Sequence, residues 1–327
     1  MKTEYSYELA NFVCKFNKHN LMDLYDEVVQ PAFLDEDIWK VKKGKFFFSD
    51  VQVVELCNEN ERTLAIAGRF IRDTVLRRKQ RYDRNTKSLI QDEQTLQSSP
   101  SSIFVLILNN HRLIYLKETP HAPTVEMFRE TCYTFLSRRT RDYAKQLSDD
   151  KRKKFITDYG LPDLRITPFT SEESLTKFIK EFSVLNTVKI TLKARNNDDI
   201  DNADLIDSLH DISESLGSSS TQLIYHNKEE GLDKDKMIEQ IRDTTKHTNQ
   251  LVQLSGLSQE NTVLKGDNTN FKIVKSITDI NLSDIKKVAN KLFEKIKDLK
   301  ASNTIKLPST EKSLQQKIDM IDIDSGS

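Results

Sequence analysis

The chain has 327 residues, of which 31% are charged and 37% are hydrophobic. This length suggests one large domain or two ordinary ones, and enough Ile, Leu, Val and Phe remain to form true cores. The 50 basic and 50 acidic side chains cancel. Overall charge therefore gives no reason to expect binding to nucleic acid or membranes, and any such argument depends on local patches.

The composition also points to a compartment. The segment from Met1 to Tyr5 contains an acid and no long apolar run, so we expect no signal peptide. No stretch approaches the ~18 apolar residues of a membrane span. Cys14, Cys57 and Cys132 lie far apart without CxxC spacing, which favours buried free thiols. We therefore expect a soluble protein of the cytoplasm.

The first half of the chain alternates strand and helix patterns. Apolar alternation and β-forming residues predict strands over 5–16, 51–57 and 63–76, and for 63–76 a helix is the alternative. Helical spacing predicts helices over 20–30, ended by Pro31, and over 125–136. The polar segment 77–97 is expected to be a long, partly irregular excursion, and the charged segment 137–154 a connector.

The most hydrophobic run of the sequence predicts a central hairpin over residues 102–117. Residues 103–108 are apolar throughout, so this strand should be covered on both faces. Asn109 and Asn110 stand at the turn, and Asn tolerates the positive φ angles of tight hairpins.

The second half shows the same mixture. We expect strands at 164–168, 184–193, 221–226, 250–257, 263–264 and 271–277, and helices at 171–182, 203–216, 234–246 and 282–299. Without a regular βαβ repeat, this order predicts an α+β fold with two mixed domains, each with a mainly antiparallel sheet covered by helices. The predicted boundaries are an N-terminal domain over 1–159, a C-terminal domain over 160–301 and a flexible tail over 302–327.

Motifs for catalysis are absent from the sequence. There is no P-loop, dinucleotide-binding, zinc-protease, nucleophile-elbow or EF-hand pattern, so we expect no cofactor and no metal. An acidic cluster is most simply the solvated face and N-terminus of a helix, with a metal site as the alternative. Its members are Asp198, Asp199, Asp201, Asp204, Asp207, Asp211 and Glu214. Glu55, Glu118 and Lys117 would have to meet in the fold to form a nuclease-type site.

The positive signal is segregated basic charge. Clusters of Lys and Arg bind phosphates by releasing counterions, and Arg adds bidentate contacts. Two basic groups are the candidate nucleic-acid-binding residues: Arg72, Arg77, Arg78, Lys79, Arg81 and Arg84 in the first, and Arg138, Arg139, Arg141, Lys151, Arg152 and Lys153 in the second. A solvated surface balanced by acids elsewhere is the alternative interpretation of both groups.

The order of elements resembles that of the RexA-like phage-exclusion proteins. The residues that carry it are Tyr7-Glu8-Leu9-Ala10, the helix after Leu21, Phe46-Phe47-Phe48, the run from Ser99 to Val105, and in the second half Thr187–Lys193 and Asp204–Leu209. This chain is longer, since segment 77–97 and the C-terminal tail are extra. The resemblance implies a cytoplasmic, non-enzymatic DNA-binding protein that acts with a membrane-protein partner.

Three functional hypotheses follow. The first is a sequence-nonspecific binder of double-stranded DNA in a prokaryotic anti-phage exclusion system, acting as a homodimer that clamps the duplex. The second is a metal-dependent nuclease effector of such a system. The third is a non-enzymatic protein-interaction subunit that uses the amphipathic last helix and the tail.

Overall fold

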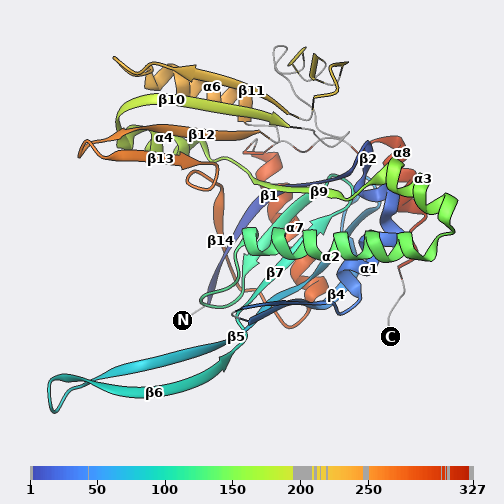
Figure 1. Ribbon diagram of the computed structural model, residues 1–327, viewed down its shortest axis with the longest axis horizontal. Coiled ribbons are helices and arrows are strands. Elements are labelled where there is room, and N and C mark those ends of the chain that lie inside the picture. Colours follow the sequence, from blue (N-terminus) through green and yellow to red (C-terminus); the bar gives the residue numbers. More distant parts are fainter. Residues whose placement is uncertain are drawn as a thin grey trace.

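The computed structural model describes residues 3–42, 44–193, 208–209, 212–213, 215–218, 220–245, 250–302, 304–305, 307 and 310–323 (Figure 1). The fold is mixed α+β, as expected, with a large curled antiparallel sheet and a smaller antiparallel sheet. The predicted helix over 203–216 and the acidic cluster from Asp198 to Glu214 fall largely or wholly outside the described residues.

The large sheet has the strand order β14-β1-β8-β7-β5-β4-β3. Its strands are β1 (Glu4–Phe16), β3 (Ile38–Val41), β4 (Gly44–Leu56), β5 (Thr63–Asp83), β7 (Ser101–Ile107), β8 (Arg112–Lys117) and β14 (Val274–Thr278), while β2 (His19–Asn20) and β9 (Pro162–Pro168) pair with β1 and β6 (Ser88–Ser98) pairs with β5.

The predicted central hairpin is confirmed as β7 and β8, and β7 is buried along its whole length. Alternate side chains explain this burial. Phe104 and Leu106 point into one core, while Ile103 and Val105 point into another on the opposite face. The turn differs from the expectation because the positive φ belongs to His111.

Helices cover both faces of this sheet. One core packs against a 3₁₀ turn (Leu21–Leu24), a π turn (Tyr25–Val29), α1 (Gln30–Leu34) and α2 (Val125–Gln146), with α3 (Asp149–Tyr159) following. The opposite core packs against α7 (Ile285–Ala301), whose apolar side is fully buried. Pro31 lies in the first turn of α1, where a missing N–H is tolerated, so it does not end the helical run. The expected connector over 137–154 instead continues α2 and begins α3.

The smaller sheet has the order β11-β10-β12-β13, and Figure 1 shows it above the large sheet. It consists of β10 (Phe182–Lys193), β11 (Ser220–His226), β12 (Leu251–Ser258) and β13 (Val263–Asp267), and its core packs against α4 (Glu172–Glu181) and α6 (Lys234–Thr245).

The division of the chain differs from the expected boundary near residue 160. Strand β9 pairs with β1 from Ala10 to Phe16, and β14 pairs with β1 from Glu4 to Glu8. The smaller sheet is therefore inserted between two strands of the large one. Sequence order cannot show this, because the pairing joins segments that are far apart along the chain.

The expected flexible tail is in part a docked segment. Helix α8 (Lys312–Asp319) buries Ile318 in the core beneath α1 and α2. The Arg62 guanidinium donates hydrogen bonds to the carbonyl oxygens of Ile318, Asp319 and Ile321 at 2.9–3.0 Å. Helix ends leave such carbonyls without partners, and Arg62 satisfies them here.

No helix in the described part of the chain is both long and apolar enough to cross a membrane.

Candidate nucleic-acid interface

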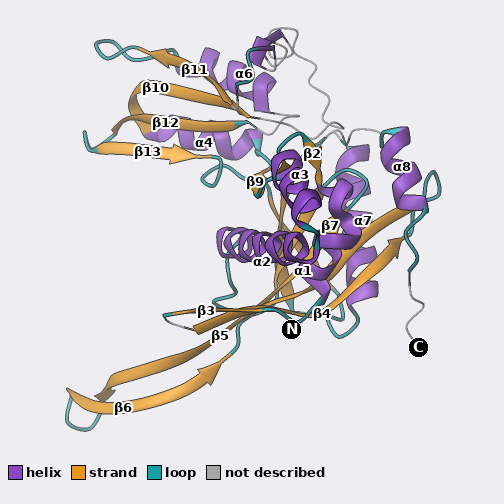
Figure 2. Cartoon of the chain, turned by 45° about the vertical axis from the view of Figure 1, so that its right-hand side comes forward, coloured by secondary structure: helices purple, strands orange, loops and turns teal. Residues whose placement is uncertain are grey.

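A two-stranded ribbon projects from the large sheet and carries most of the first basic group (Figures 1 and 2). We call residues 74–98 the ribbon. Strand β5 leaves the sheet after Asp73 and pairs with β6 from Thr74 to Asp83. Ten residues in a strand span roughly 33 Å. The segment expected to be partly irregular is therefore a paired hairpin, with one bulge where the register shifts between Arg78 and Gln80.

The tip of the ribbon is a turn held by an aspartate. The Asp83 carboxylate accepts hydrogen bonds from the backbone N–H groups of Asn85, at 2.8 Å, and Thr86, at 3.4 Å. Lys87 adopts a positive φ of 50°. Asp and Asn favour such turns through local hydrogen bonds of this kind. The turn explains why the chain reverses within a segment that contains no glycine or proline.

One face of the ribbon is basic. Successive strand side chains alternate between faces, so Arg77, Lys79 and Arg81 share one side. All three are exposed. Arg81 Nε lies 3.1 Å from Asp92 Oδ2. The side chains of Arg77 and Lys79 form no hydrogen bond or ion pair with any residue that the structure describes.

The remaining members of the first group lie at the ends and on the other face. Arg84 is exposed at the tip and has no partner among the described residues. Arg78 belongs to the other face by strand alternation, and its guanidinium pairs with Asp92, which Arg81 also contacts. Arg72 lies at the root of the ribbon, opposite Phe46 of β4, and its N–H donates to the Pro100 carbonyl at 3.0 Å. The group therefore extends from root to tip.

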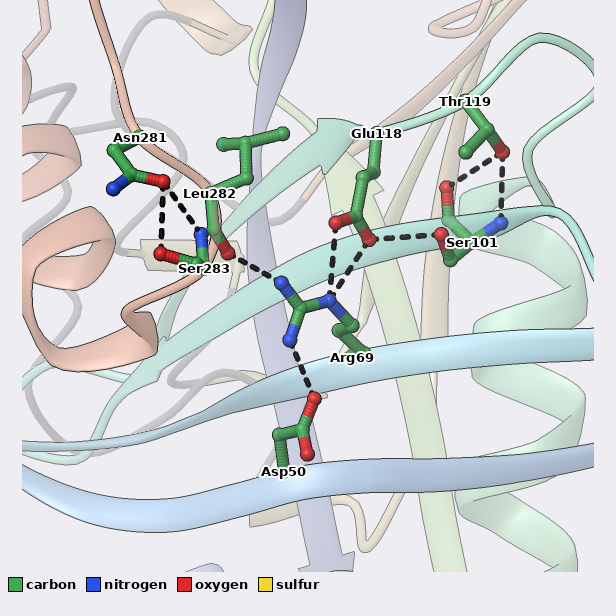
Figure 3. Close-up of polar contacts among 8 residues, drawn as sticks. All are labelled: Asp50, Arg69, Ser101, Glu118, Thr119, Asn281, Leu282 and Ser283. Carbon is green, nitrogen blue, oxygen red and sulfur yellow. Dashed lines mark hydrogen bonds and ion pairs between the residues drawn. The ribbon is translucent and has the colours of Figure 1, made fainter.

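A partly buried ion-pair network fixes the root of the ribbon (Figure 3). Arg69 Nε lies 3.0 Å from Glu118 Oε1, and its other nitrogens bond Asp50 and the Leu282 carbonyl. Ser101 Oγ donates to Glu118 at 2.8 Å. Burial alone would lower the pKa of Arg69, but the hydrogen bonds and charges of the two acids together raise it. One guanidinium thus ties β5 to β4, to the end of β8 and to the loop before α7.

Three of the four arginines of the second basic group form ion pairs or hydrogen bonds with other residues of the chain. Arg138 lies 3.0 Å from Asp37, and Arg139 reaches both Asp35, at 3.0 Å, and Asp37, at 2.9 Å. Arg152 donates to the carbonyls at the end of α2, with its Nε 3.1 Å from the Ala144 oxygen. These contacts join α2 to the segment before β3 and to α3.

Three residues of the second group remain free to reach a ligand. Arg141, Lys151 and Lys153 are exposed on α2 and α3. Both views place α3 near α8, at the end of the molecule away from the ribbon (Figures 1 and 2). The fold therefore does not join the two basic groups into one surface.

The acids considered for a nuclease site do not meet. Glu55 lies opposite Leu64 of β5 and pairs with Arg62, whereas Glu118 pairs with Arg69. Leu64 and Arg69 are five positions apart on one strand, or roughly 17 Å. Among the described residues, no group of three or more His, Cys, Asp or Glu side chains could hold a metal ion.

The remaining candidates have structural roles. The last helix directs its lysines to solvent and its apolar side into the core, so that side is not available to a partner. Cys14 and Cys132 are buried as expected, and burial raises the pKa of both thiols, whereas Cys57 is exposed.

The ribbon and its second face were not predicted from the sequence. A signal was present, because apolar residues recur on both sides of the turn around Asn85. Leu76 and Tyr82 lie six positions apart before the turn, and Leu89 and Leu96 lie seven apart after it, where a bulge takes up the extra residue. Comparison of the chain with models of known protein families finds no match, and neither does comparison with curated proteins.

Proposed function

We propose that this protein binds double-stranded DNA without sequence preference, through the basic face of the ribbon. The observation that carries the proposal is the exposed row Arg77, Lys79 and Arg81 on a structure that projects from the body. Alternate strand positions recur about every 6.6 Å. That is about twice the 3.4 Å axial spacing of phosphates along one DNA strand, so each side chain can reach a separate phosphate.

The shape of the ribbon supports the same proposal. The major groove of B-DNA admits a two-stranded β-ribbon. Arg84 and Lys87 at the tip add positive charge where the ribbon would extend furthest along a duplex. Lys and Arg contacts of this kind give affinity without reading bases.

The biological setting is proposed from the resemblance to RexA-like proteins. It places DNA binding within a prokaryotic phage-exclusion system that includes a membrane-protein partner. The order of elements supports this setting, and the basic residues support the binding independently of it.

The test is a titration of labelled duplex at several salt concentrations, using two variants that each lose three positive charges. The ribbon variant is Arg77→Gln/Lys79→Gln/Arg81→Gln, and the matched control is Arg141→Gln/Lys151→Gln/Lys153→Gln. Each lost phosphate contact reduces the magnitude of the slope of log affinity against log salt concentration by about 0.9. The slope of the ribbon variant, which loses three contacts, should therefore be smaller in magnitude by about 2.7. The control should keep the slope of the unmodified protein.

Two outcomes would count against this proposal. An unchanged slope in the ribbon variant would mean that the basic face of the ribbon does not bind the DNA. An equal decrease of the slope in the control variant would mean that residues of α2 and α3 bind it as well. Recovering the DNA at full length, with and without magnesium, separates binding from the nuclease hypothesis.

A further inference from the structure

The face of the ribbon opposite its basic row exposes large apolar side chains. Leu76 pairs across the strands with Leu96, and Tyr82 pairs with Leu89. Their exposed fractions are 51%, 66%, 57% and 69% in that order. Grouped exposure of this kind, unlike a single exposed leucine, marks an interaction surface.

The two apolar pairs are placed symmetrically. On β5, Leu76 and Tyr82 each lie three positions from Lys79, at the middle of the ribbon. Between them this face carries two polar pairs, Arg78 with Gln94 and Gln80 with Gln91. A two-fold axis through the middle would place Leu76 of one ribbon over Tyr82 of another, and polar pairs over polar pairs. Such a self-complementary patch is what an isologous contact requires.

We propose that this apolar face packs against the same face of a second copy of the chain, with the two ribbons antiparallel. A lipid surface fits less well, because the central Arg78 and the three glutamine side chains of this face would have to leave water for an apolar layer. A second copy instead presents matching amide groups, which can bond one another across the interface. The basic rows then face outward, so the contact does not depend on the proposed DNA binding.

The dimensions of the ribbon set the strength of this contact. A face of roughly 33 by 10 Å gives a total buried area on the order of 700 Å². Stable protein interfaces bury about 1,200–2,000 Å². The dimer is therefore weak and reversible, and it forms at high protein concentration.

Chemical cross-linking tests the arrangement directly. Leu76→Cys and Tyr82→Cys are made as separate variants in a Cys57→Ser background, so that only the new thiol is exposed. Facing sheets pack about 10 Å apart, too far for a direct disulfide, so a short bismaleimide is used. We expect a covalent dimer when the two variants are mixed and little or none from either variant alone.

Each other result overturns the proposal. Dimers from a single variant would mean that identical residues meet, and their absence from the mixture would mean that these faces do not. As a second measurement, sedimentation should show a self-association at least tenfold weaker for Leu89→Ser/Leu96→Ser, whose side chains lie outside all three cores. If the unmodified chain stays monomeric while this variant loses DNA affinity, the face contacts nucleic acid instead.

Discussion

Replacing Arg69 with Met is expected to lower the free energy of unfolding of the large sheet by about 3 kcal/mol. Removing one partner of a buried ion pair costs about 3–5 kcal/mol, because the other charge stays buried and unpaired. The Arg69 and Glu118 side chains are 16% and 15% exposed, which favours the lower end of that range. The contact with Asp50 adds little, since Asp50 is 52% exposed and exposed pairs contribute at most about 1 kcal/mol.

Urea unfolding followed by tryptophan fluorescence measures this loss. Trp39 is the single tryptophan of the chain and lies on β3, with its ring 5.7 Å from that of Phe46. With a denaturant dependence of about 2–3 kcal/mol per molar urea, the midpoint should fall by about 1 M. Arg69→Lys keeps the positive charge but loses the planar guanidinium that bonds several partners at once. Its free energy of unfolding should fall by about half as much as that of Arg69→Met.

A double-mutant cycle with Glu118→Gln isolates the ion pair. We expect a coupling energy of at least about 1 kcal/mol, since the two side chains are in direct contact. A loss below about 1 kcal/mol for Arg69→Met, or a coupling energy near zero, would refute the assignment of this network as the anchor of the ribbon.

Three further outcomes are expected. Phe48→Ala should cost about 3–5 kcal/mol in the same unfolding assay, because the Phe48 ring lies 5.2–5.7 Å from five other phenylalanine rings, and Phe48→Leu should cost less than half of that. A thiol reagent at neutral pH should modify one cysteine, Cys57, in the folded protein and all three only after unfolding. Burial alone would raise the pKa of Asp23, but hydrogen bonds from Lys317 and a backbone N–H and nearby positive charge together lower it. At pH values above 3.8, the ordinary pKa of an Asp carboxyl, Asp23→Asn should therefore have a lower free energy of unfolding than the unmodified protein. This difference in free energy should vanish as the pH falls through the lowered pKa of Asp23.

Much of the fold could be predicted because burial leaves a direct mark on composition. The run from Ile103 to Leu108 is apolar throughout, and the structure confirms a strand with both faces covered. The last helix shows its buried side through residues spaced three and four apart. Such patterns are local, so a single sequence shows them.

Pairing between distant segments leaves no comparable mark. The sequences of β14 (Val274–Thr278) and β9 (Pro162–Pro168) do not indicate that both strands pair with β1. For this reason the sequence did not predict that the smaller sheet is inserted between them. The docked helix α8 was hidden for a related reason. Part of its attachment consists of backbone carbonyls that accept hydrogen bonds from Arg62, and carbonyls are the same in every sequence.

The candidate interface was predicted in part, by its charge but not by its shape. A ribbon in solvent needs no apolar run, so the polar composition of segment 77–97 suggested irregular structure. Yet Leu76, Tyr82, Leu89 and Leu96 contribute to none of the three cores, and they stay exposed although they pair across the ribbon. The side chains of Arg77 and Lys79 likewise bond no described residue. Apolar pairs on one face of the ribbon and basic side chains without described partners on the other are what the two proposed contacts, with a second copy of the chain and with DNA, each require.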